Sequence, residues 1–163
     1  MSQLVMITAS MALLGSALVA GVFFAFSSFV MKALAAVPSS QGIAAMQSIN
    51  VVVINRSFLG TFFGTAGISL VIAGLAIIEP DSPATAFFVG GAIFYIVGTF
   101  IVTVLGNVPL NNQLARVLAN DATSDRIWKH YLARWTMWNH IRTVSAVFAT
   151  LAFIAGLLKY GTG

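Results

Sequence analysis

Residues 82–115 read SPATAFFVGGAIFYIVGTFIVTVLGNVPLNNQLA and contain no charged side chain. This run is longer than the ~20 apolar residues that a helix needs to cross a hydrocarbon core of ~30 Å. A second uncharged run extends over residues 1–31. Only 7% of the 163 residues are charged, whereas a soluble domain has roughly 25%. The chain is therefore predicted to fold in a membrane.

The hydrophobic runs predict four membrane spans separated by one tight turn and two long connections. We expect one all-α domain over residues 1–163, an integral membrane four-helix bundle, with spans at about 4–31, 57–78, 84–106 and 135–158. The segment Glu79-Pro80-Asp81-Ser82-Pro83 is typical of a turn and links the second span to the third. Short interfacial or cytoplasmic helices are expected in the two long connections, which join spans one and two and spans three and four.

The charged residues indicate the orientation of the chain. Seven of the eight basic residues lie in or beside the long connections: Lys32, Arg56, Arg116, Arg126, Lys129, Arg134 and Arg142. The positive-inside rule then places these connections in the cytoplasm and both termini outside, and we expect a bacterial inner membrane. So few basic residues do not predict a phosphate-binding patch, so no nucleic acid partner is expected. The chain has no cysteine, which excludes thiol–disulfide chemistry and cysteine-ligated metals within it.

A break in the third span is the first candidate site. Pro109 has no N–H and its ring crowds the carbonyl of Leu105, so the helix must kink or restart there. A carbonyl freed in lipid needs a hydrogen-bond partner. Asn107 and Asn111 are four residues apart and share a face if the helix resumes. Their amides either satisfy the broken backbone or form the floor of a pocket and face a ligand.

A polar and aromatic stripe opens the fourth span. At 100° per residue, five side chains fall within about 80° of one helix face: Trp128, Tyr131, Trp135, Asn139 and Arg142. Arg142 lies about two turns inside the span, where an ionisable residue marks a functional site unless it snorkels to the interface. Asp121 and Asp125 are the only acidic residues on this side of the membrane. Arg142 is expected either to snorkel beside a tryptophan belt or to face an anionic or carbonyl-bearing ligand.

The two histidines do not predict a shared metal site. On a straight helix, ~15 Å and about 80° of rotation separate His130 from His140. His130 is expected at the surface. His140 is a candidate general base or a single haem or metal ligand, although a lone histidine at the start of a helix more often only forms hydrogen bonds.

Small and aromatic residues mark two further surfaces. One narrow stripe on the second span consists of glycines: Gly60, Gly64, Gly67 and Gly74. Such a stripe lets helices approach closely in lipid, either within the bundle or, through Gly60, Gly64 and Gly67, in a homo-oligomer. Phenylalanines near the basic ends of two spans are candidate walls for a flat aromatic ligand: Phe23, Phe24 and Phe26, with Phe58, Phe62 and Phe63.

Four segments together resemble one family of membrane proteins. They are residues 21–27 (GVFFAFS), 41–50 (QGIAAMQSIN), 107–111 (NVPLN) and 135–142 (WTMWNHIR), in this order along the chain. Chains with this pattern are small four-span membrane proteins grouped as anthrone-oxygenase-like. Members in fungal polyketide pathways are associated with oxidation of anthrones to anthraquinones by dioxygen, whereas most bacterial members have no assigned substrate.

The resemblance implies a membrane-embedded oxidoreductase that acts on a flat hydrophobic substrate, anthrone-like or quinone-like. The match falls on Asn50, Asn107, Asn111, Trp135, Asn139 and Arg142. Loss of the acidic C–H of an anthrone gives an enolate that can reduce dioxygen without a cofactor. Such a site needs a base, donors to the oxyanion and an aromatic cavity that excludes water.

On this interpretation His140 is the expected base, and Asn107, Asn139 and Arg142 are the expected oxyanion donors. Substrate-binding side chains are expected at Asn50, Asn111, Trp135, Trp138, Phe23 and Phe26. Two alternatives stay open: a haem- or metal-dependent oxidoreductase with His140 as ligand, and a nonenzymatic bundle that binds a quinone or other lipid or serves as a partner subunit. In each case the expected partners are a hydrophobic small molecule and the bilayer.

Overall fold

The computed structural model describes residues 2–119 and 123–161, and every regular element in these ranges is a helix. Four helices are long and apolar enough to cross a membrane: Gln3–Ala36, Arg56–Ile78, Thr85–Leu114 and Ser124–Tyr160. The shortest of the four has 23 residues, which as an α-helix extend over ~34 Å. The predicted integral membrane four-helix bundle is confirmed.

Two of the four spans contain π-helical segments. The first span consists of α1 (Ser2–Ala25), the π-helix η1 (Phe26–Val30) and α2 (Met31–Ala36). The third consists of α5 (Thr85–Ile93), the π-helices η2 (Phe94–Ile101) and η3 (Thr103–Asn107), and α6 (Val108–Leu114). The second and fourth spans are the continuous helices α4 (Arg56–Ile78) and α7 (Ser124–Tyr160), and α3 (Ser39–Val52) links the first span to the second.

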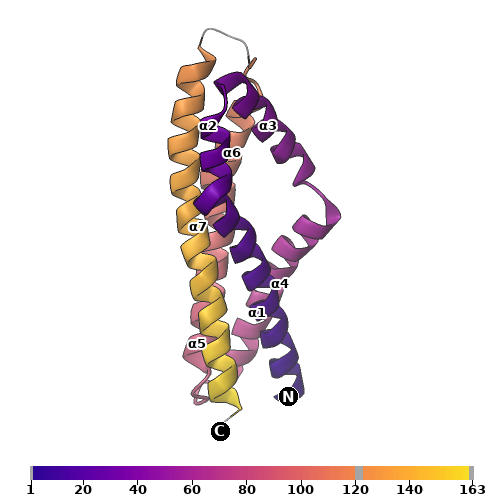
Figure 1. Ribbon diagram of the computed structural model, residues 1–163. Coiled ribbons are helices and arrows are strands. Elements are labelled where there is room, and N and C mark those ends of the chain that lie inside the picture. Colours follow the sequence, from indigo (N-terminus) through magenta and orange to yellow (C-terminus); the bar gives the residue numbers. More distant parts are fainter. Residues whose placement is uncertain (1, 120–122, 162–163) are drawn as a thin grey trace.

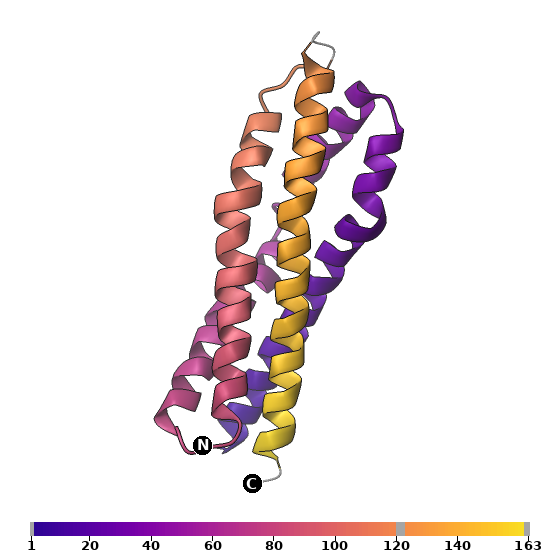
Figure 2. The same cartoon turned by 90° about the vertical axis from the view of Figure 1, so that its left-hand side faces the viewer.

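The other helices pack around α7. It lies against α1 on one side and against α5 and η2 on the other. Helix α4 packs on α1 and α5 and completes the bundle at the end that holds both ends of the chain (Figure 1). At the opposite end, α2, α3, α6 and the first turns of α7 form a second group of helices (Figure 2). Both long connections therefore lie at one end of the bundle, as four crossings require.

The third and fourth spans are longer than the hydrophobic runs that predict them. The third continues past Pro109 to Leu114, because Pro109 lies in the first turn of α6, where a helix needs no N–H donor. Helix α7 begins at Ser124, so the helical segment expected in the last connection is continuous with the fourth span. No proline or glycine interrupts residues 124–155, and a change to polar residues alone does not end a helix. Residues 120–122 of the expected turn lie outside the described residues.

Two hydrophobic clusters hold the bundle together. The larger packs all four spans against one another and includes the fully buried Tyr95 and Phe153. The smaller lies where α3, α6 and α7 meet and includes Trp128 and Trp135. Along α7, the buried polar residues Asn139, Arg142 and Thr143 fall between Trp135 of the smaller cluster and Ala149 of the larger one. The candidate site therefore lies at the boundary between the two clusters.

Some glycines permit close packing inside the bundle, but the glycines of the predicted stripe on α4 do not. A Cβ on Gly106 would lie 2.8 Å from the ring of Trp138, and one on Gly42 would lie 2.8 Å from the ring of Trp128. The four glycines of the stripe on α4 are exposed and a Cβ on any of them would meet open space: Gly60, Gly64, Gly67 and Gly74. Packing within the bundle is therefore not their use, and contact with a second copy of the chain stays a prediction.

Two adjacent glycines on α5 test this packing. A Cβ on Gly91 would lie 2.7 Å from Phe153 Cε1, whereas a Cβ on Gly90 would have nothing within 4 Å. We expect Gly91→Val to destabilise the fold by about 1–3 kcal/mol through overpacking. Gly90→Val makes the same chemical change on the same helix and should leave the thermal unfolding midpoint in detergent unchanged. Equal midpoints for the two variants would contradict the packing of α5 on α7.

Candidate active site

A row of polar side chains along the third span forms hydrogen bonds with α7. Its members recur at every fourth position: Thr99, Thr103, Asn107 and Asn111. Thr99 Oγ1 donates to the carbonyl of Arg142 at 3.5 Å, and Thr103 Oγ1 accepts from the Arg142 guanidinium at 3.3 Å. Asn107 Nδ2 donates to the carbonyl of Trp135 at 3.1 Å, and Asn111 Oδ1 accepts from Trp135 Nε1 at 2.8 Å. The row therefore fixes the third span against the polar stripe of α7.

The π-helical segments keep this row on one face. In an α-helix, each fourth residue passes a full turn by about 40°. A π turn holds more residues, so its fourth residue falls short of a full turn. Segments η2 and η3 cover most of the interval from Thr99 to Asn107, and α6 covers the rest to Asn111. The two deviations oppose each other along the row, so the side chains from Thr99 to Asn111 all reach α7.

Arg142 is the one buried residue among the eight basic residues, with 4% of its surface exposed. Its Nη2 donates to Asn139 Oδ1 at 2.7 Å, and its Nη1 donates to Thr103 Oγ1 at 3.3 Å. The guanidinium carbon lies 4.1 Å from the ring centre of Phe23 and 5.1 Å from that of Trp135, within the range of cation–π attraction. The side chain does not snorkel, so the first of its two predicted states is wrong.

No carboxylate pairs with Arg142 in residues 2–119 and 123–161. Asp125 is exposed in the first turn of α7, ~26 Å along the helix from Arg142. Asp121 lies outside the described residues. An ionised side chain within a membrane span costs at least a few kcal/mol, and a bound anion or strong acceptor would offset part of that cost.

Asn139 orients the guanidinium and joins α7 to the first span. While its Oδ1 accepts from Arg142, its Nδ2 donates to the carbonyl of Phe23 at 2.8 Å and to Ser27 Oγ at 2.7 Å. Ser27 lies in η1 and also forms a 3.0 Å hydrogen bond with Thr143. Asn139 is completely buried, so these hydrogen bonds are strong and would be expensive to leave unmade.

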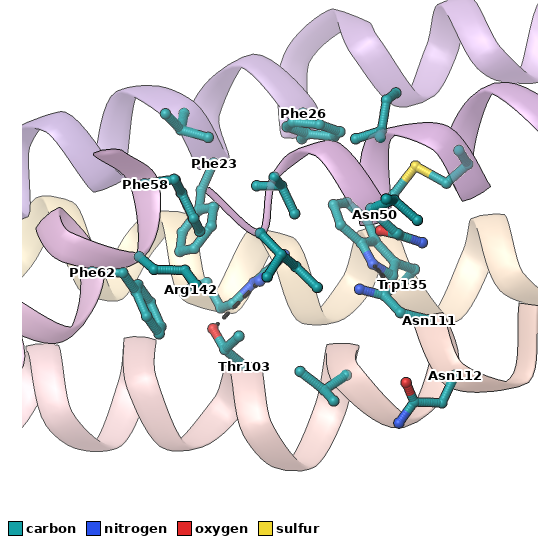
Figure 3. Close-up of a pocket in the computed structure, with 18 of the residues that line it drawn as sticks. Phe23, Phe26, Asn50, Phe58, Phe62, Thr103, Asn111, Asn112, Trp135 and Arg142 are labelled. Atoms are coloured by element: carbon teal, nitrogen blue, oxygen red, sulfur yellow. Dashed lines mark hydrogen bonds between the residues drawn. The ribbon is translucent and has the colours of Figure 1, made fainter. Parts of the chain in front are cut away.

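A cavity of about 390 Å³ lies beside the guanidinium. This volume is within the roughly 300–1,000 Å³ of small-molecule sites. Figure 3 shows Arg142 among aromatic rings at one end of the cavity and the amides of Asn50 and Asn111 toward the other. The walls come from all four spans and from α3, and their aromatic members are Phe23, Phe26, Phe58, Phe62, Phe63 and Trp135.

The polar side chains in the wall supply unpaired donors. Arg142 Nε and Asn50 Nδ2 are buried and have no hydrogen-bond partner in the described part of the chain. The Asn50 amide lies beside the Tyr131 hydroxyl, but its Nδ2 does not reach hydrogen-bond geometry. Asn111 Oδ1 accepts from Tyr131 at 2.9 Å and from Trp135 at 2.8 Å, which turns its amide nitrogen away from both. Polar side chains therefore border the cavity at both of its ends (Figure 3).

The structure brings six of the ten predicted site residues to the cavity wall: Phe23, Phe26, Asn50, Asn111, Trp135 and Arg142. The remaining four are not in the wall: Asn107, Trp138, Asn139 and His140. Asn107 and Asn139 are buried behind it and hold Trp135 and Arg142 in place. Trp138 packs its ring on Gly106 of η3. These four side chains therefore support the site without facing a ligand in this cavity.

His140 is exposed and does not belong to the cavity wall. Its Nδ1 lies 2.9 Å from Ser27 Oγ, and Ser27 in turn accepts from Asn139. Its role as a base stays a prediction, but this geometry gives it no direct contact with a ligand in the cavity. Within the described ranges, no three histidine, cysteine or carboxylate side chains gather as a metal site. A haem or metal held by His140 would lie outside the cavity.

Three side chains that form hydrogen bonds at or beside the candidate site were not predicted. Thr103 Oγ1 accepts from the Arg142 guanidinium, and Ser27 Oγ accepts from Asn139. Gln47 Nε2 donates to the carbonyl of Leu114, the last residue of α6, at 2.8 Å and to that of Val117 at 3.0 Å. The fourfold spacing of the polar residues in the third span could have identified Thr103. Ser27 and Gln47 lie in the resembling segments 21–27 and 41–50, but nothing in their spacing distinguishes them from their neighbours.

The fold and the cavity define an integral membrane helical bundle with an aromatic, donor-bearing site beside a buried arginine. Residues 55–152 match the family described as anthrone oxygenase. Because this match covers more than half of the chain, the chain belongs to the anthrone oxygenase family. The matched range contains Arg142 and its support from Asn139 and Thr103, and the resembling segments 21–27 and 41–50 precede it. No curated protein and no solved structure matches the chain.

Two adjacent amides on α6 test the polar wall. Asn111→Leu would leave the Tyr131 hydroxyl and Trp135 Nε1 without their acceptor, at about 1–3 kcal/mol for each buried donor. Asn112 is exposed, and no hydrogen bond of its side chain is recorded within the described ranges. We expect the thermal unfolding midpoint to fall clearly for Asn111→Leu and to stay near the native value for Asn112→Leu. The reverse order would refute the assigned hydrogen bonds.

Proposed function

We propose that this protein oxidises a flat, lipid-soluble aromatic ketone of the anthrone type with dioxygen in the cavity beside Arg142. The observation that carries the proposal is a buried guanidinium without a carboxylate partner in the described residues, at the wall of an aromatic cavity. Membership of the anthrone oxygenase family supports the same reaction class. An ionised group at such a place is a functional candidate in a membrane protein.

The cavity fits a fused-ring substrate in both shape and chemistry. Phe58 stacks on Phe62 with ring centres 5.9 Å apart, and Phe26 packs at 5.4 Å from Trp135. Rings in these positions favour a flat aromatic ligand by burial and by offset stacking. Arg142 lies near one edge of such a ligand and Asn50 near another (Figure 3). A ketone oxygen would bind the guanidinium, and further ring oxygens would bind the amides.

The guanidinium would act on the charge that develops during the reaction. No histidine or carboxylate lines the described cavity wall, so a hydroxide ion from solvent would take the proton from the methylene carbon of an anthrone. This transfer moves negative charge to the ketone oxygen. Arg142 would stabilise that enolate, and because its hydrogen bonds to Asn139 and Thr103 already fix it, little reorganisation is needed. The same positive charge lowers the pKa of the bound C–H. Arg142 is thus assigned as the oxyanion donor, with Asn139 and Thr103 as positioning residues.

The oxidation then balances without a further reductant. The enolate carbon bonds one oxygen atom of dioxygen, and the O–O bond breaks as that carbon loses its second hydrogen. The methylene carbon becomes a carbonyl carbon, while the other oxygen atom leaves as water with both hydrogens. Dioxygen accepts four electrons, and the carbon gives up four. A cavity lined by apolar rings would shield the enolate from water during these steps.

Replacement of the charged Arg142 by a neutral residue tests its assignment as the oxyanion donor. In lipid nanodiscs, we expect Arg142→Gln to lower kcat for anthrone oxidation by about 10²–10³-fold, the usual loss on removing an oxyanion donor. Lys129 is exposed on α7 and outside the cavity wall, so Lys129→Gln removes a charge from the same helix and should keep the native rate. Oxygen uptake and quinone absorbance, corrected with empty nanodiscs, give the rates.

Several results would count against the proposal. Native turnover by folded Arg142→Gln would remove Arg142 from the reaction. A Soret band or stoichiometric metal in the purified active protein would favour the cofactor-dependent alternative. Tight binding of an anthrone that is never oxidised would indicate a ligand-binding protein instead.

A further inference from the structure

The elbow between α3 and α4 is the most exposed apolar segment beside the cavity. We define the elbow as residues 51–55. Val51 is 72% exposed, Val52 is 67% exposed and Ile54 is 68% exposed. Figure 1 shows this elbow projecting sideways from the other helices. Three neighbouring apolar side chains with so much free surface need a nonaqueous environment.

The elbow also lies at the edge of a membrane span. Helix α4 begins directly after it at Arg56 and is one of the four candidate spans. Its 23 residues extend over ~34 Å, slightly more than a hydrocarbon core of ~30 Å. The first turn of α4 therefore falls near one boundary of the core. Arg56 is exposed there, which suits a side chain that reaches anionic headgroups while the elbow contacts acyl chains.

The elbow forms one rim of the cavity. Val51 and Ile54 belong to the cavity wall, and the wall continues to exposed apolar residues on the third span. Val104 on η3 is 46% exposed and Val108 on α6 is 40% exposed. Helix α3 packs on α6, and α4 packs on α5 and η2, so the elbow and η3 lie on the same side of the bundle with the cavity between them. The mouth of the cavity is thus rimmed by exposed apolar side chains.

We propose that the cavity opens to the acyl chains between the elbow and η3, and that its ligand enters sideways from the bilayer. The elbow is inserted among the acyl chains of the leaflet that contains the basic end of the bundle. The ligand class is a nonionised, lipid-dissolved ring compound, which approaches with its apolar edge first. This inference concerns access to the cavity and does not depend on the reaction that follows.

Asn55 holds the elbow in this position. Its Oδ1 accepts from the Phe58 N–H at 2.9 Å, and its Nδ2 donates to the carbonyl of Val52 at 2.9 Å. One side chain therefore caps the start of α4 and also binds the end of α3. Phe58 is itself part of the cavity wall. These two hydrogen bonds of Asn55 hold the mouth of the cavity and the adjacent aromatic wall together.

The absence of native cysteine permits a clean labelling test. Ile54→Cys is labelled with bimane and placed in vesicles whose phosphatidylcholine is brominated on the acyl chains, which quench by contact. Leu70→Cys, 61% exposed within the α4 span, is the lipid-facing reference, and Leu118→Cys, 76% exposed in the connection beyond α6 and outside the four spans, is the reference outside the acyl chains. We expect the label at position 54 to be quenched as strongly as that at 70. Quenching no stronger than at 118 would overturn the insertion of the elbow.

A rate measurement tests access through the mouth. The Ile54→Cys and Leu118→Cys variants are modified with N-cyclohexylmaleimide, and binding of 9,10-anthraquinone in nanodiscs is followed by quenching of tryptophan fluorescence. We expect modification at position 54 to slow association and dissociation by a similar several-fold factor, with little change in Kd. The reason is that the ligand both enters and leaves the cavity through the mouth. Modification at 118 should change neither rate. Unaltered rates at 54 would overturn sideways access.

Discussion

A positive charge buried among aromatic rings is the constraint on which this structure depends. The guanidinium of Arg142 has an amide oxygen, a hydroxyl and two ring faces around it, and no carboxylate in the described part of the chain. Neutral partners of this kind hold a cation in place but do not neutralise it. The resting site therefore favours a ligand that brings negative charge or develops it during a reaction. A structural arginine would gain more from a buried carboxylate or from a position at the interface.

Several contacts between the helices hold the guanidinium of Arg142 in place. Asn139 joins it to the first span through Phe23 and Ser27, and Thr103 joins it to the third. The π-helical segments of the first and third spans lie beside these contacts. Such segments occur often at functional sites, where they redirect side chains that a regular helix would turn elsewhere. The π-helical segments η1 and η3 thus lie where the buried polar side chains of the site lie.

The sequence predicts the spans and the polar stripe well because both depend on simple periodicity. Burial of Trp135, Asn139 and Arg142 follows from their place on one helix face. The cavity itself depends on the path of α3, which polarity alone does not determine, so the full set of wall residues could not be predicted. His140 was assigned from chemical type, yet it is one residue after Asn139 and so faces about 100° away from it. Thr103 was missed because the polar row of the third span was followed only from Asn107 to Asn111 and not back to Thr103.

One measurement on the buried charge tests the central claim most directly. The ionisation of 2-hydroxyanthraquinone changes its visible absorbance, so its pKa can be followed while it is bound in nanodiscs without turnover. An unpaired guanidinium in the cavity predicts that binding lowers the pKa of this hydroxyl by about 1–3 units, and that Arg142→Gln removes the shift. A bound probe with the same pKa in both proteins, equal to its value in protein-free lipid, would show that Arg142 does not act on the ligand.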